Sequence, residues 1–274
     1  MESDFRDRAI PWHEHPPTAL EYENVPVDLS DPRSREALVD PVECGVAGSG
    51  YYARTDRLNA PYYRRFASAS ERVFCRRSVA ERLSEANELL LPLGVELFVL
   101  NGYRSLALQK ELWAFYIEKG RESLDDPTQA NCVAFAGEYC SDPREFDHLD
   151  PRTWPTHITG GAVDLTLRIR KTGELLFMGG VFDDPDDVSH TAYFEKVNAE
   201  HMSEKKEIPL SYVEALRNRR LLYWAMREAG FANYPYEWWH YDWGKQFWIT
   251  NWDTSPTGAD RPKSAWYGPA EVAR

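Results

Sequence analysis

The chain has 274 residues, of which 43% are hydrophobic and 14% aromatic, and this length and composition predict a folded protein with one substantial core. Its formal net charge of −12 at pH 7 argues against nucleic-acid binding and against attraction to anionic membranes. Residues 1–7 lack an apolar signal core and no apolar run approaches the roughly 20 residues of a membrane span, so we expect a cytoplasmic protein that stays out of the membrane.

Composition along the chain predicts a single catalytic domain with two additions. Residues 1–35 are rich in proline, aspartate and glutamate, which indicates an extended N-terminal arm. The catalytic domain is expected to cover residues 36–274. Within it, residues 121–155 are polar and acidic, and we interpret them as an insertion.

Apolar periodicity predicts a mixture of helices and strands. Val95 to Leu100 is typical of a strand, and it leads directly to Arg104. Ser211 and Glu214 have the spacing of a capping box at a helix start. Helices are expected over residues 78–90, from Leu108 to Gly120, and from Ser211 to Ala229. We therefore predict an α+β fold with helices packed on a small, mainly antiparallel sheet.

A first polar motif precedes and enters a predicted strand. Apolar and polar residues alternate over 163–168, which is typical of a half-buried strand with Asp164 on its polar face. His157 lies seven residues before Asp164. The intervening Gly160–Gly161 pair allows a tight turn, which would bring His157 back beside Asp164.

A second polar motif, Glu-Trp-Trp-His-Tyr, occupies residues 237–241. The aromatic-rich run 238–243 predicts a strand. Glu237 and His240 would then face opposite sides, because side chains alternate along a strand. If both face one metal ion, Glu237 must lie in the turn after Pro235 or at a bulge.

These residue types are the components of a catalytic zinc site. Such a site has three protein ligands, here His157, Asp164 and His240, and leaves one position for water. The metal lowers the pKa of that water and a nearby carboxylate, here Glu237, takes its proton. Two alternatives remain open from the residues alone: a solvated Asp164 beside an aromatic core strand, or a two-His-one-Asp Fe(II) oxygenase site.

The two motifs belong to a longer series of blocks, in order over roughly residues 75–250, that resembles the zinc D-alanyl-D-alanine dipeptidases. These are relatives of the vancomycin-resistance dipeptidase among the Hedgehog-like zinc peptidases. The matching blocks include Gly102-Tyr103-Arg104, the His157, Gly160 and Asp164 pattern, Met178 to Asp183, Asn218 to Leu222 and Glu237 to His240.

The resemblance implies zinc-dependent hydrolysis of a small dipeptide, D-Ala-D-Ala, in a role connected with the cell wall. It implies a role for each matching residue. One zinc ion would be bound by His157, Asp164 and His240, with Glu237 as general base, Arg104 stabilising the oxyanion, Asp183 holding the substrate ammonium group, and Thr156 at the substrate-carboxylate end.

Three positions depart from the family pattern. Pro155 and Thr156 replace residues that are usually serine, and Thr159 replaces a basic residue. These departures leave open a second substrate class, another small D-amino-acid peptide or amide. Hedgehog-type domains can also bind zinc without turnover, but the presence of both Glu237 and Arg104 argues for a hydrolase over that alternative and over the oxygenase.

Overall fold

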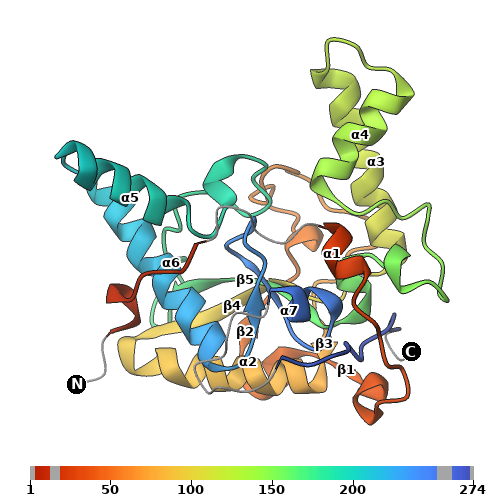
Figure 1. Ribbon diagram of the computed structural model, residues 1–274, viewed down its shortest axis with the longest axis horizontal. Helices are drawn as coiled ribbons and strands as arrows, with labels where there is room; N and C mark the ends of the chain where they lie inside the picture. The colour runs from red at the N-terminus through yellow and green to blue at the C-terminus, as the bar shows by residue number, and fades with distance from the viewer. Residues whose placement is uncertain (1–3, 13–18, 252–260, 272–274) are drawn as a thin grey trace.

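The computed structural model describes residues 4–12, 19–251 and 261–271 and confirms the α+β class (Figure 1). Its main sheet has five strands in the order β2-β4-β5-β7-β6. β2 runs parallel to β4, and the other neighbours are antiparallel. The strands are β2 (Ala47–Gly48), β4 (Val95–Asn101), β5 (Ala162–Ile169), β6 (Ala232–Asn233) and β7 (His240–Asp242).

Two helices, α2 (Arg77–Leu90) and α6 (Leu210–Glu228), pack against each other and against the sheet (Figure 1). The apolar side chains that alternate along β5 belong to the same buried core as Leu83 of α2 and Leu222 of α6. Fully burying such a leucine contributes roughly 1.5–3 kcal/mol. The core therefore occupies one face of the sheet, and the opposite face is left for polar residues.

Helices α3 (Leu106–Ser123) and α4 (Gln129–Tyr139) form a pair that projects away from the sheet (Figure 1). Near the base of this pair, the rings of Tyr116 and Tyr139 are stacked with their centroids 4.5 Å apart. Helix α4 lies within the acidic segment 121–155. After α4 the chain returns toward the sheet.

The N-terminal segment lies against the body of the protein. Ile10 is buried with Tyr223 and Trp224, and the ring centroid of Tyr22 lies 4.1 Å from that of Phe247. The domain boundary at residue 35 stays a prediction. The remaining elements are α1 (Ala19–Glu23), α5 (Tyr193–Glu204), α7 (Gln246–Thr250) and the small antiparallel sheet of β1 (Leu38–Val39) with β3 (Cys75–Arg76). No helix of the described part of the chain is long and apolar enough to cross a bilayer.

Three local predictions were wrong. The capping box is not formed, because Pro209 is the N-cap of α6 and Ser211 lies inside the first turn. The strand expected over residues 238–243 is limited to β7, because Trp238 donates its backbone N–H to Ser189 rather than to a neighbouring strand. β5 is not half-buried, since both of its faces are covered from Ala162 to Leu167.

Candidate metal centre and active site

Three neighbouring strands place polar side chains in one row on the face of the sheet opposite the apolar core. Asp164 of β5 is paired with Asn101 of β4 on one side and with His240 of β7 on the other. A bulge after Val99 shifts the register of β4 and brings Asn101 into this row. Its amide donates to Asp164 Oδ2 over 2.8 Å.

His157 reaches the row through the predicted glycine turn. The short 3-10 helix Thr156–Thr159 ends at Gly160, whose φ is 70°. A Cβ on Gly160 would lie 2.5 Å from Leu38 Cδ2, and one on Gly161 would lie 2.7 Å from the Trp243 carbonyl oxygen. Only glycine fits both positions. The turn places His157 Nε2 3.2 Å from Asp164 Oδ2, as expected.

The ligand atoms of His157, Asp164 and His240 all lie within 4.8 Å of one another, and all three residues are buried. Each imidazole uses its other nitrogen for an oxygen partner. His157 Nδ1 lies 2.8 Å from the Gly102 carbonyl, and His240 Nε2 lies 3.2 Å from Asp242 Oδ1. With the protons on these outer nitrogens, His157 Nε2 and His240 Nδ1 can present their lone pairs to an ion beside Asp164, which is the arrangement of metal-binding histidines. The donor set therefore fits a metal ion.

The charges around the cluster favour a cation. Burial lowers the pKa of His157 to about 3, so this ring is neutral and its lone pair is available. Burial also opposes the charged form of Asp164, but its hydrogen bond with His240 and the charge of Arg104 hold the pKa of Asp164 below its usual value. His157 and Asp164 are therefore in the forms that zinc requires, a neutral imidazole and an ionised carboxylate. Burial opposes the charged form of His240, but Asp242 and Asp164 raise its pKa to about 10, so zinc binding would displace a proton from this ring.

Glu237 lies in the turn after Pro235, as predicted, and its backbone N–H donates to the Tyr234 carbonyl. Its Oε2 is 3.5 Å from His240 Nδ1, and 35% of its side chain is exposed. The amide of Asn233 donates to the carbonyls of both Glu237 and His240, 3.0 Å each, which holds the turn. Burial, followed by the negative charges of Asp164 and Asp183, raises the pKa of Glu237 to about 7.

Arg104 enters from the loop between β4 and α3. Its backbone N–H donates to the His157 carbonyl, and its side chain is only 11% exposed. Nη2 lies 2.8 Å from the Tyr52 hydroxyl and 3.8 Å from Asp164 Oδ2, while Nε has no hydrogen-bond partner among the described residues. The preceding Gly102 is required, because a Cβ there would lie 2.3 Å from the Phe74 carbonyl oxygen.

Asp183 lies in a left-handed backbone conformation, with φ of 57°. Its Oδ2 accepts hydrogen bonds from the hydroxyls of Tyr52 and Tyr62, each 2.8 Å long. Burial, followed by the charge of Asp164, raises the pKa of Asp183 to about 6. Through Tyr52, which also binds Arg104, this carboxylate is linked to the metal cluster.

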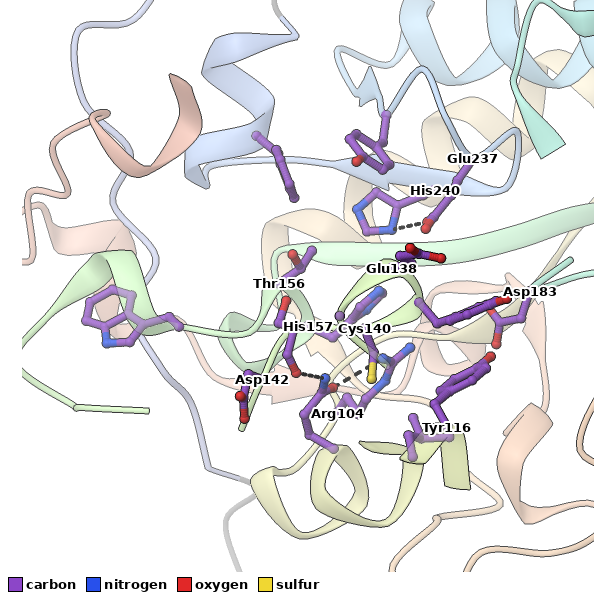
Figure 2. A pocket seen from close by; sticks show the side chains of 18 of the residues that line it. Arg104, Tyr116, Glu138, Cys140, Asp142, Thr156, His157, Asp183, Glu237 and His240 are labelled. Atoms are coloured by element: carbon purple, nitrogen blue, oxygen red, sulfur yellow. Dashed lines mark hydrogen bonds and ion pairs between the residues drawn. The ribbon is translucent and has the colours of Figure 1, made fainter. Parts of the chain in front are cut away.

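All seven predicted site residues line one cavity of about 350 Å³. Figure 2 shows Glu237 beside His240, with Asp183 at the right of the view and Thr156 nearer its centre. Pro155 and Thr159 do not line the cavity. Thr159 is buried, and its hydroxyl accepts from the Gly161 N–H. Of the three departures from the family pattern, only Thr156 therefore meets the pocket.

A family model described as D-ala-D-ala dipeptidase matches residues 39–255. The chain belongs to this dipeptidase family. The D-alanyl-D-alanine dipeptidase of Synechocystis is 29% identical over 214 residues, covering 72% of this chain and 78% of the relative. That of Streptomyces coelicolor is 29% identical over 205 residues, covering 75% and 89%. The Escherichia coli dipeptidase is 34% identical over 116 residues, covering 42% of this chain and 50% of the relative.

The structure of this dipeptidase-family chain adds site residues that the sequence analysis missed. Asn101 donates to Asp164, Tyr52 joins Arg104 to Asp183, and Asp242 contacts Nε2 of His240. Asp242 carried a usable signal, since it follows His240 by two residues and the strand period of two puts both on one face. Tyr52 carried no such signal, because it is 131 residues from Asp183.

Proposed function

We propose that this chain is a zinc-dependent dipeptidase that hydrolyses D-Ala-D-Ala, with the metal bound by His157, Asp164 and His240. The observation that carries this proposal is the convergence of these ligands with Glu237, Arg104 and Asp183 on one cavity. When bound, zinc lowers the pKa of a water molecule and polarises the substrate carbonyl. Family membership and the position of Glu237 support hydrolysis over the oxygenase alternative.

Glu237 acts as the general base and then as the general acid. It takes a proton from the attacking water as the C–O bond forms, and it delivers that proton to the leaving amine as the C–N bond breaks. A pKa of about 7 suits both steps at neutral pH. The exposed part of the side chain faces the cavity that would hold the substrate.

Arg104 stabilises the negative charge that develops on the former carbonyl oxygen. Tyr52 and Gln109 hold its guanidinium in place, so no reorganisation is needed during the reaction. Its low exposure strengthens the interaction, because electrostatic attraction is larger away from bulk water.

Asp183 binds the free ammonium group of the substrate. Two tyrosine hydroxyls fix Oδ2, and no described residue donates a hydrogen bond to Oδ1. Because Asp183 and the metal ligands line the same cavity, the distance between the ammonium group and the scissile bond is limited. This limit places the scissile bond close to the free amino terminus of the substrate.

Acetyl-D-Ala-D-Ala is expected to be cleaved at least about 30-fold more slowly than D-Ala-D-Ala, measured as kcat/KM. Acetylation removes the charge that Asp183 pairs with, and leaving a buried charge unpaired costs on the order of 2–5 kcal/mol, of which the lower end is about 30-fold in rate. In Asp183→Asn the difference between the two substrates should shrink, because the charge pair is already absent. Equal rates on both substrates with the unmodified enzyme would contradict the assignment of Asp183.

A second candidate substrate is a D-amino-acid dipeptide amide. Around the catalytic groups the cavity wall carries four acidic residues, Glu23, Glu138, Asp142 and Glu145, against one further arginine, Arg152. Arg152 is already paired with Asp150, and Asp142 is likewise paired with Arg144, which leaves Glu23, Glu138 and Glu145 as the excess negative charge. A C-terminal carboxylate would be repelled by this wall, whereas an amide would not.

D-Ala-D-Ala amide is therefore expected to have a KM no higher than that of D-Ala-D-Ala. The comparison should be made at low and at high salt, because screening weakens the repulsion of the free acid. A KM for the amide that is about tenfold higher would mean that the enzyme binds the substrate carboxylate favourably.

A further inference from the structure

A buried lysine and aspartate lie directly behind the metal ligand His240. Asp242 Oδ1 is 3.2 Å from His240 Nε2 and 3.4 Å from Lys245 Nζ. The exposed fractions of Asp242 and Lys245 are 0% and 3%. The same carboxylate oxygen of Asp242 therefore contacts both the imidazole of His240 and the ammonium group of Lys245.

The local backbone explains how a lysine comes to lie there. β7 ends at Asp242, and the chain then turns at Gly244, whose φ is 70°. A Cβ on Gly244 would lie 2.6 Å from Tyr267 Cε2, so glycine is required. The N–H of Trp243 donates to the Gly161 carbonyl, which ties this turn to the turn that follows His157. The turn returns Lys245 to the carboxylate of Asp242.

Fold stability does not account for this pair. Burying two charges costs several kcal/mol for each ion, and a well-packed apolar pair is often as stable or more stable. Here the hydrogen bonding is also incomplete: Asp242 Oδ2 and Lys245 Nζ have no hydrogen-bond partner among the described residues. A costly, incompletely satisfied pair beside a metal ligand points to a role at the metal.

We propose that Asp242 and Lys245 are positioning residues for the metal site. Lys245 holds the Asp242 carboxylate in place, and Asp242 accepts the Nε2–H of His240. This hydrogen bond fixes the tautomer and the rotation of the ring, so that Nδ1 presents its lone pair beside Asp164. The inference rests on the proposed zinc site, but it does not depend on which dipeptide is the substrate.

The test is the zinc affinity of purified protein, measured by competition with a chelator. Asp242→Asn and Lys245→Met are each expected to weaken zinc binding by about 10–100-fold, the usual effect of removing the outer partner of a ligating histidine. Because the two residues act through one hydrogen bond, the double variant should lose little more than Asp242→Asn alone. Fully additive losses, or unchanged zinc affinity in either folded single variant, would overturn the proposal.

A matched control separates positioning from general stability. Arg220 and Glu195 form another ion pair, 2.6 Å long, with 15% and 10% of their side chains exposed, and neither lines the active-site cavity. Arg220→Met should lower the melting temperature and leave zinc affinity unchanged. If Arg220→Met loses as much zinc affinity as Lys245→Met, the loss in both variants comes from general destabilisation of the fold, and the proposal is overturned. If Lys245→Met fails to fold, the nearly isosteric Asp242→Asn decides the question.

The measurement of zinc affinity tests the positioning role independently of the proposed dipeptidase activity. A weakened zinc site in Asp242→Asn supports the positioning role even if the unmodified protein does not cleave D-Ala-D-Ala. Conversely, cleavage of D-Ala-D-Ala with unchanged zinc affinity in the variants would support the dipeptidase and refute the positioning role.

Discussion

Replacing Glu237 with glutamine is expected to lower kcat for D-Ala-D-Ala hydrolysis by about 10²–10⁴-fold, the usual contribution of general acid–base catalysis. Glutamine keeps the size of the side chain and cannot accept the proton of the attacking water. Glu237 is outside the three-ligand cluster, so the variant should keep its zinc. The measurements are steady-state kinetics and the zinc content of the same sample.

Glu138→Gln provides the matched control, because Glu138 is an exposed glutamate that lines the same cavity outside the metal cluster. Its kcat should change by no more than a few-fold. A Glu237→Gln enzyme with nearly full kcat would reassign the base. Loss of zinc together with activity would instead make Glu237 a ligand.

Replacing His240 with alanine is expected to remove both the zinc and the activity. One of three protein ligands is lost, and the Asp164 carboxylate loses its partner at 2.9 Å, so the remaining two ligands cannot hold the ion in an open catalytic site. Metal analysis after dialysis against buffer without added metal measures the outcome.

His190→Ala is the control for removing a histidine. His190 is half-buried, its Nε2 lies 3.8 Å from Asp187 Oδ1, and it is outside the ligand cluster. This variant should keep one zinc ion for each chain. A full equivalent of zinc in His240→Ala would rule out the ligand set, whatever the activity of that variant.

Local sequence patterns determined where most of the elements lie. Helical periodicity predicted α2, α3 and the body of α6, and alternation predicted β5, because the 3.6-residue and 2-residue periods are properties of consecutive side chains. The strand-like segment from Val95 to Leu100, after Gly94, predicted β4. The turn at Gly160–Gly161 and the position of Glu237 in the turn after Pro235 could also be predicted from the sequence. Backbone conformation at these positions depends on the residue itself.

Family blocks supplied candidate roles, and the residues that carry these roles line one cavity. The sequence was weaker where local propensity and tertiary contacts disagreed. Trp238 and Trp239 have strong strand propensity, yet they lie in a turn because Trp238 bonds to the loop at Ser189. The segment 121–155 appeared to be only polar and acidic, and the structure makes its helix α4 and the following loop one wall of the active-site cavity.

Only the tertiary structure decided which partners complete the site. The bulge that brings Asn101 beside Asp164 depends on strand pairing, and the burial of Lys245 depends on how the turn at Gly244 packs on Tyr267. Tyr52 meets Asp183 across 131 residues of chain. Periodicity describes neighbours along one element, whereas these contacts arise from how separate elements pair and pack. The sequence by itself therefore determined the candidate ligands and the elements that carry them. The packing of those elements determined what surrounds the candidate ligands.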